Sequence, residues 1–386
     1  MGSAEDNILY KSTINTLYKK FKLKCEFICD EGQHTVFVVF DPDRKRKMRV
    51  KISSSTSVKR AEEIVEWPNL FHPNILPLYN IFRYDQRIRI FLMPYTESTM
   101  AEQLHPERTR NLFGGFLTVK KWLYQILSAL DYLHVRNLHH LNLNLENQLI
   151  TDHGNIRLSD FEHLNSKNKI IKIDEVGMKT VYRPPELCWY EENQIGKKEF
   201  VASHLDLWAY GIISLQAITA QKLNLDPIRW QCNSHLSNWR LWKIEVGDTL
   251  NLITRKPTYF QYILQSSYPT TIFTKRDIRN CYSFLYSFLR EDPENRIPVK
   301  YAIKHNFLSP YNRERFSKPI CELTLEDKLG KTASLSCLQI TYPIIENEGK
   351  KNIEIPGKVK TKKIKRVESC PNSLEYFAKP NKNISI

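Results

Sequence analysis

The sequence lacks the features that place a chain in a membrane or in an oxidising compartment. No apolar run approaches the ~20 residues that a transmembrane helix needs, and the first residues, MGSAED, lack the apolar core of a signal peptide. The eight cysteines are scattered and form no CxxC pair, so neither a zinc site nor a disulfide framework is expected from them. We therefore expect a cytoplasmic protein with no transmembrane segment and with reduced thiols.

The composition is that of a folded chain with an excess of positive charge. The 386 residues are 41% hydrophobic and 11% aromatic, which is enough for one large two-lobed domain or two smaller ones. The formal net charge of +15 favours an acidic partner, such as nucleic acid or a membrane surface. A solvated basic surface explains the same charge, so both interpretations stay open.

Part of this charge lies near the end of the chain. From Lys350 onward the sequence is polar and has few periodic apolar residues, so we expect disorder there. Residues 358–366, KVKTKKIKR, form a basic cluster. Such a cluster is typical of a nuclear import signal or of a contact with acidic membrane or nucleic acid, although a solvated tail is an equal alternative.

The rest of the chain is organised around residues 139–162, HHLNLNLENQLITDHGNIRLSDFE. Two short apolar segments, 148–150 and 156–159, flank a His153-Gly154-Asn155 turn signal, which predicts a hairpin. Polar residues at fixed spacing precede the first strand and follow the second. This stretch resembles the catalytic loop H-R-D-L-x-x-x-x-N and the D-F-G motif of protein kinases.

The resemblance extends over roughly residues 15–310 and implies an α+β, bilobal protein-kinase-like fold. It implies a small lobe with a five-stranded antiparallel sheet and one helix, and a mainly helical large lobe. Apolar patterning places the small-lobe strands at 22–30, 34–40, 47–52, 76–81 and 87–93, the helix at 57–67, and a long helix at 117–136.

The expected domain order follows from this resemblance. It is a leader (1–20), the small lobe (21–93), the large lobe (94–310) and a basic, disordered tail (311–386). The large lobe is about 30 residues longer than a compact kinase needs, and the extra segment, about 221–265, holds Trp230, Trp239 and Trp242. This insert is interpreted either as added packing or as a docking surface, because tryptophan is favoured at interface hot spots.

The resemblance assigns no intact catalytic residue. Asn142 stands at the position of the general base, and Asn144 stands at the position of the catalytic-loop lysine. An amide cannot take up a proton at neutral pH, so Asn142 cannot act as the base. Asn147 and Asp160 match the two metal-ligand positions, which leaves magnesium binding possible in principle.

Some of the nucleotide-binding positions match the kinase pattern and others do not. The three positions of the glycine-rich loop are Cys29, Glu31 and His34, so none of them is glycine, and Glu31 would repel phosphate. Arg49 replaces the small alanine that contacts adenine in kinases, and burying its guanidinium costs hydration. Against these losses, the residues that would bind ATP if it binds are Lys51, Glu63 (with Glu62 as the alternative partner of Lys51), Met93 and Tyr95.

Other matched residues have structural roles in the family. His140 is the histidine of the catalytic loop and Phe161 the phenylalanine of D-F-G, and they are expected to join Trp67 and Leu78 in an apolar column anchored by Asp206. Two further residues, Glu186 and Arg296, are expected to form an ion pair, because they match the A-P-E and D-P-x-x-R motifs.

Three functional hypotheses follow from these matches. The first is a pseudokinase that acts as a scaffold or allosteric protein partner, with an active kinase as one candidate partner. The second is a weakly active ATP-dependent serine/threonine kinase that uses a displaced base such as Glu146 or Glu162. The third is an adaptor whose basic tail reaches the nucleus, nucleic acid or an acidic membrane.

Overall fold

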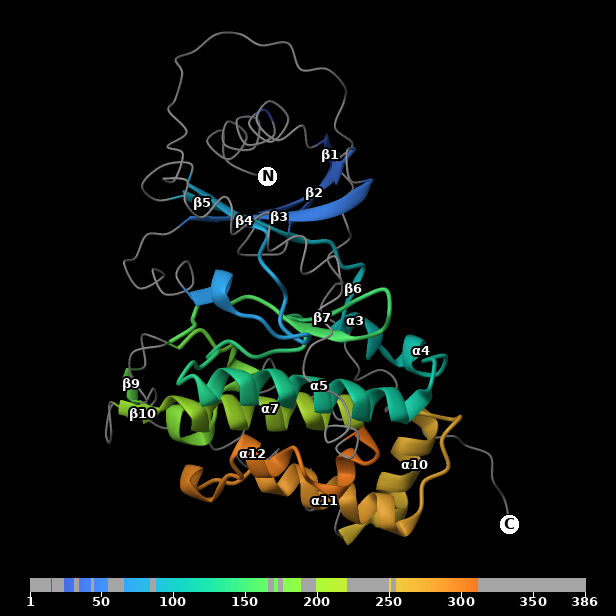
Figure 1. Ribbon diagram of the computed structural model, residues 1–386. Helices are drawn as coiled ribbons and strands as arrows, with labels where there is room; N and C mark the ends of the chain where they lie inside the picture. The colour runs from blue at the N-terminus through green and yellow to red at the C-terminus, as the bar shows by residue number, and fades with distance from the viewer. Residues whose placement is uncertain are drawn as a thin grey trace, which may run out of the picture. The chain divides into compact units, whose positions relative to one another are not determined.

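The computed structural model describes residues 15, 24–30, 35–42, 45–54, 66–83, 88–165, 170–172, 176–188, 199–220, 250 and 255–311. The chain divides into two compact units. The described residues of the first unit lie within 15–54 and 80–95, and those of the second lie within 66–79 and 96–311. Figure 1 labels most of the helices and strands of the two units.

The first unit is built on an antiparallel sheet. Within the described part of the chain its five strands lie in the order β1-β2-β3-β5-β4. Their bounds are β1 Lys24–Asp30, β2 Thr35–Asp41, β3 Arg46–Ser54, β4 Asn80–Arg83 and β5 Ile88–Pro94. Valine, isoleucine and phenylalanine dominate the central strands, where β-branched and aromatic side chains pack well. One face is buried by side chains that include Phe37, Val39 and Val50.

The strand expected at 76–81 is wrong in its first half. Leu76 and Leu78 alternate as strand residues do, and both are buried, but β4 begins only at Asn80. The backbone of this stretch pairs elsewhere: the Leu76 amide donates to the Leu158 carbonyl at 2.9 Å, and the Leu158 amide donates to the Asn74 carbonyl at 2.8 Å. Its hydrogen bonds are therefore satisfied within the second unit rather than in the sheet.

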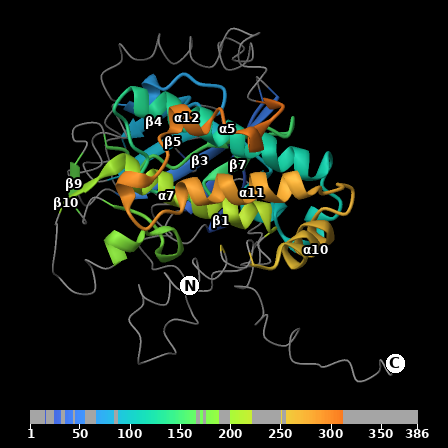
Figure 2. The ribbon, with the colours of Figure 1, turned by 90° about the horizontal axis from the view of Figure 1, so that it is seen from below.

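The second unit is mainly helical. Its central helices are α5 (Gly115–Val135) and α7 (Ala202–Ile218), which lie side by side, with α11 (Lys275–Phe288) against α7 (Figures 1 and 2). Nearly every residue of α7 is buried, and α5 buries one apolar stripe. The Tyr210 hydroxyl of α7 donates to the Leu123 carbonyl of α5 at 3.0 Å, which joins the two helices in the core.

The other elements of this unit are shorter. They are η2 Trp67–Asn69, β6 Ser98–Thr99, α3 Met100–Gln103, α4 Pro106–Thr109, β7 Gln148–Ile150, β8 Ile156–Leu158, β9 Ile170–Lys172, η4 Thr180–Tyr182, β10 Glu199–Val201, α10 Pro257–Ser267, η5 Pro293–Asn295, α12 Val299–Ala302 and η6 Asn306–Leu308. The strands β6, β7 and β8 form one antiparallel sheet, and β9 pairs with β10. The sheet of β6, β7 and β8 positions the loop that precedes β7.

Several expected features lie outside the described residues. They are Glu31, His34 and Glu63, the helix at 57–67 apart from its last two residues, the three tryptophans of the insert, and the basic cluster 358–366. The part of the expected insert from 255 onward is described and contributes α10. Among the described helices, none combines the length and the apolar character that crossing a bilayer requires.

Candidate functional site

The hairpin of β7 and β8 places Asn147 and Asp160 next to each other. Asn147 directly precedes β7, and Asp160 follows β8 by two residues. The Ser159 amide and hydroxyl both donate to the Asn147 carbonyl, at 2.9 and 3.0 Å, which ties the start of one strand to the end of the other. The turn between the strands that the sequence predicts thus brings two residues that are 13 positions apart into contact.

Asn142 and Asn147 both direct their amide groups at the Asp160 carboxylate. The Nδ2 of Asn142 donates to Asp160 Oδ2 at 2.8 Å, and the Nδ2 of Asn147 reaches the same oxygen at 3.3 Å. Asn147 Nδ2 also donates to the Asn142 carbonyl at 2.8 Å. Hydrogen bonds to a charged acceptor are the stronger kind, so this three-residue network, which we call the amide clamp, fixes Asp160 from the side of the loop.

Asn144 is used within the loop rather than presented to solvent. Its side chain is 1% exposed. Its Oδ1 accepts from the Asn147 amide at 2.9 Å, and its Nδ2 donates to the Asn142 carbonyl at 3.2 Å. The Leu145 amide donates to the buried Tyr182 hydroxyl at 3.3 Å, and burial raises the pKa of Tyr182, which therefore stays neutral. The loop is held by polar contacts along its whole length.

Asp206, in the first turns of α7, anchors the start of the loop. Its two carboxylate oxygens accept from the His140 and Leu141 amides, each at 2.9 Å, and Leu141 has a left-handed φ of 57°. A non-glycine residue in this region is strained by about 1–2 kcal/mol, and these bonds hold it. Burial, the largest single influence, would raise the pKa of Asp206, but the hydrogen bond from His134 and the electrostatic interactions with the neighbouring histidines together lower it below its usual value.

The rings of Trp67, Phe161 and His140 form an aromatic column next to the backbone that Asp206 anchors. The ring of Trp67 lies 5.2 Å from that of Phe161, and the ring of Phe161 lies 5.1 Å from that of His140. His140 is fully buried, and burial lowers its pKa, so its ring is neutral; its Nε2 donates to the Ser159 carbonyl at 3.0 Å. Leu78 is also buried. The column thus packs the residue after Asp160 against the start of the loop.

Glu186 and Arg296 form a two-pronged ion pair. Arg296 Nη1 and Nη2 lie 2.6 and 2.7 Å from the two oxygens of Glu186. Arg296 is 2% exposed and also donates to the carbonyls of Arg290 and His204 at 3.0 and 3.1 Å. A planar guanidinium suits such paired contacts, which a lysine cannot reproduce. This pair ties segments that are 110 residues apart in the sequence.

In the first unit, two of the expected nucleotide-binding residues, Lys51 and Met93, lie on the same sheet face as Arg49. Arg49 pairs in register with Val38 and Met93, while Lys51, two residues along β3, pairs with Val36 and Phe91. Residues that are opposite each other or two apart point to the same face. Lys51 and Met93 are buried, and Arg49 is half-buried. Tyr95 packs on the pair Val36 and Val38.

These residues fit neither a nucleotide nor a pair of magnesium ions well. On the sheet face, the half-buried cation of Arg49 stands between Val38 and Met93, where a purine needs a flat apolar contact. In the amide clamp, Asn147 turns its NH₂ rather than its oxygen toward Asp160, and Oδ2 already accepts two N–H groups. Metal ions of this kind require oxygen donors.

Sequence reasoning missed two features of the site. The first is the amide clamp: the sequence indicates only a lost base at Asn142, although an amide beside a carboxylate is also a donor. The second is the contact of His134 Nε2 with Asp206 Oδ2 at 3.0 Å. No local pattern indicates this contact, because His134 and Asp206 are 72 residues apart in the sequence.

Comparison with known proteins gives one family match and several distant relatives. A family model described as "Protein kinase domain" matches residues 32–308. The chain is 24% identical to "Cyclin-dependent kinase 17" of Caenorhabditis elegans over 68% of this chain and 38% of the relative. It is 29% identical to "Cyclin-dependent kinase-like 4" of Homo sapiens over 52% of each chain.

A third relative is "Serine/threonine-protein kinase SIK2" of Gallus gallus, which is 24% identical over 86% of this chain and 35% of the relative. The chain thus spans between about a third and a half of the length of these three relatives. The family match covers more than two thirds of the chain and includes every residue of the amide clamp.

Proposed function

This chain belongs to the protein kinase family, and we propose that it is a catalytically inactive member, a pseudokinase, that acts by binding another protein in signalling. One observation carries this proposal: Asn142 Nδ2 donates to Asp160 Oδ2 at 2.8 Å. The residue at the position of the base is a hydrogen-bond donor to the residue at a metal position. It can neither accept a proton from a substrate hydroxyl nor leave that carboxylate oxygen open.

The size of the expected loss supports inactivity. Loss of general-base assistance costs about 10²–10⁴ in rate. Asn144 brings no positive charge to the position of the catalytic-loop lysine, and its amide is buried in contacts within the loop. Removing one electrostatic stabiliser of a transition state costs a further ~10²–10³. The two effects overlap, but each alone is large.

The scaffold around the loop supports a binding role. The Asp206 anchor, the aromatic column and the Glu186–Arg296 pair hold the second unit together although the reactive groups differ. A fold stabilised in this way can present a defined surface to a partner without turnover. We propose that the partner is a protein, with an active kinase as one candidate, and that the segment 221–265 contributes to the contact.

A direct assay tests inactivity. The purified full chain is incubated with labelled ATP, magnesium and generic protein substrates beside an Asp160→Ala variant. We expect the same background incorporation from both proteins. Incorporation above background that disappears in Asp160→Ala would reject the proposal, because the variant differs only at the position of the metal ligand.

A weakly active serine/threonine kinase is the second candidate. The names of several relatives favour it, and so do Lys51, Asn147 and Asp160, which match nucleotide and metal positions. This candidate requires a residue outside the usual position to act as the base, and the two glutamates available for that role are poorly placed. Glu146 is exposed but lies 3.3 Å from Lys179, and Glu162 is buried at 6% exposure. If Glu146 were that base, Glu146→Gln would abolish incorporation as Asp160→Ala does.

The basic tail supports a third candidate, an adaptor that reaches the nucleus, nucleic acid or an acidic membrane. Its support is the charge of residues 358–366. We propose a cytoplasmic protein that the tail brings to the nucleus. Deletion of 350–386 should shift a fluorescent fusion toward the cytoplasm, and an unchanged distribution together with unchanged partners would remove this candidate. Affinity capture of partners by the full chain and by a variant without residues 221–265 shows whether partner binding depends on the insert rather than on the tail.

A further inference from the structure

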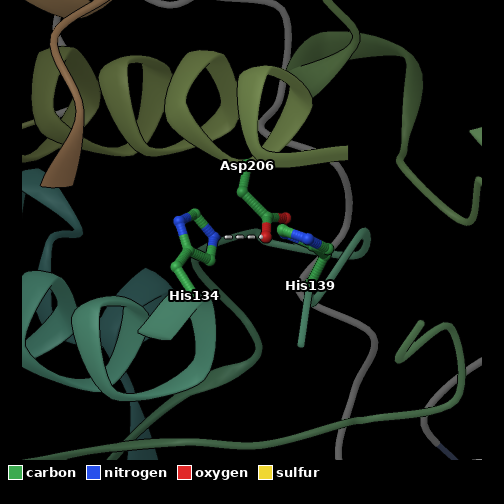
Figure 3. Close-up of side chains that lie close together, drawn as sticks. All are labelled: His134, His139 and Asp206. Atoms are coloured by element: carbon green, nitrogen blue, oxygen red, sulfur yellow. Dashed lines mark hydrogen bonds and ion pairs between the residues drawn. The ribbon is translucent and has the colours of Figure 1, made fainter. Parts of the chain in front are cut away.

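A second cluster of potential ligands lies where the last turn of α5, the loop that follows it and the first turns of α7 meet. Among the residues that the structure describes, His134, His139 and Asp206 form the group whose nitrogen and oxygen atoms could hold a metal ion, all within 4.8 Å of one another. Figure 3 shows the His134 and His139 side chains beside the Asp206 carboxylate. The two imidazole rings lie 5.0 Å apart, centre to centre.

Each member of the cluster is held by a different part of the second unit. His134 is in the last turn of α5, and Asp206 is in the first turns of α7. His139 lies in the loop that follows α5, where its amide and carbonyl exchange hydrogen bonds of 3.0 Å with Asn165. Three separately fixed backbones therefore present two nitrogen donors and one oxygen donor to one point.

The spacing suits a small ion with tetrahedral coordination. Zinc binds imidazole nitrogen and carboxylate oxygen at about 2.0–2.2 Å, so its ligand atoms lie about 3.3 Å apart. His134 Nε2 and Asp206 Oδ2 are already 3.0 Å apart. No two of the ligand atoms are more than 4.8 Å apart, so binding of zinc requires the most distant pair to move closer together. Nitrogen donors favour zinc over magnesium or calcium.

The existing bonds of Asp206 leave room for such an ion. Its Oδ1 accepts from the Leu141 amide, and its Oδ2 accepts from the His140 amide and contacts His134. An ion bound to both His134 Nε2 and Asp206 Oδ2, to one side of the line that joins them, replaces their direct contact and leaves both backbone bonds in place. His134 then carries its ring hydrogen on Nδ1. The side chain of His134 is 14% exposed, whereas that of Asp206 is fully buried.

We propose that His134, His139 and Asp206 form a zinc site that fastens α5, the loop and α7 to one another. The site is structural and needs no nucleotide, so it does not depend on whether the chain transfers phosphate. Zinc binding should raise the unfolding temperature of the full chain, because an ion that binds only the folded state stabilises it.

The test uses the full chain, freed of metal by a chelator, with zinc and cobalt as probes. Zinc affinity is measured by competition with a chromophoric chelator in the original chain, in His139→Leu and in His153→Leu. His153 is the matched control, since its side chain is 77% exposed and lies 3.9 Å from an aspartate, Asp152. We expect His139→Leu to weaken one zinc equivalent by more than about tenfold and His153→Leu to leave it unchanged.

X-ray absorption of the cobalt- or zinc-loaded original chain keeps the test decisive if His139→Leu does not fold. The proposal requires two imidazole ligands with oxygen, and no sulfur. A spectrum dominated by thiolate, equal affinities in the original chain and His139→Leu, or equal losses in both variants would overturn it. Each of these results would mean that zinc binds elsewhere on the chain.

Discussion

Replacing Asn142 by aspartate should destabilise the chain at neutral pH when divalent cations are absent. The variant replaces the N–H group that lies 2.8 Å from Asp160 Oδ2 by a second carboxylate. It loses a hydrogen bond to a charged acceptor, which contributes about 1.5–3 kcal/mol. It also adds a like-charge contact of about 4 kcal/mol at 4 Å with an effective dielectric constant of 20.

Relaxation of the loop and entry of water reduce this sum, so we expect a net loss of about 2–4 kcal/mol in the free energy of unfolding. The loss should depend on pH. Repulsion raises the pKa of the carboxyl pair in the folded state above its value in the unfolded chain, which is near 4. The destabilisation is therefore present at neutral pH and disappears as pH falls below about 4, where the pair carries a proton.

Urea unfolding at about pH 5 and about pH 8 measures this effect, with and without millimolar magnesium. Asn111→Asp, at an exposed position, adds the same charge and is the matched control. Magnesium should restore part of the stability of Asn142→Asp at the higher pH, because the variant supplies two carboxylates for the ion. Equal stability of Asn142→Asp and the original chain at the higher pH would refute the reasoning from the amide clamp.

Three further substitutions test the scaffold. Asp206→Asn should lower the unfolding free energy by about 3–5 kcal/mol, because it breaks a buried charged network. Since folding lowers the pKa of Asp206, the stabilisation that its carboxylate provides is present above about pH 4 and is lost as pH falls through the folded-state pKa. Arg296→Lys should cost about 2–4 kcal/mol through loss of the paired contact with Glu186. Gly177→Ala should cost about 1–3 kcal/mol, because its Cβ would meet the His163 ring at 2.1 Å, and adding His163→Ala should recover most of that loss.

Urea or thermal unfolding reads out all three. Arg279→Lys, at an exposed position, is the control for Arg296→Lys and should change stability by less than about 0.5 kcal/mol. An Asp206→Asn curve that matches the original chain at every pH would contradict the anchor role. If His163→Ala fails to rescue Gly177→Ala, the two residues do not share the contact that the structure gives them.

The hairpin around residues 148–158 and the long helix could be predicted from the sequence because their signals are local. The turn His153-Gly154-Asn155 lies between two apolar segments, and β7 and β8 form there. The apolar period from Leu117 to Leu133 identifies the helix that the structure places at Gly115–Val135. In both cases the burial pattern repeats within one element, so neighbouring residues are enough to show it.

The strand expected at 76–81 failed because its pairing partner is distant in sequence. Alternation at Leu76 and Leu78 is the same for a sheet strand and for an extended segment that bonds to Leu158. Only the fold decides between these two. The same reason hid the contact between His134 and Asp206, which are 72 residues apart.

The amide clamp was hidden for a chemical reason. The sequence shows that Asn142 differs from the family pattern, and a lost carboxylate is the immediate interpretation. That the replacing amide turns its NH₂ toward Asp160 depends on side-chain orientation, which no spacing reveals. The substitution thus changes the site twice, once by removing a base and once by adding a donor.

Phosphate transfer by the unmodified chain is the most direct test of the central claim. Incorporation of label per mole of chain, measured with ATP and magnesium over generic substrates, should be equal for the original chain and Asp160→Ala. Incorporation by the original chain that exceeds the Asp160→Ala background, and that scales with the amount of chain, would contradict the claim that this kinase-family protein is inactive.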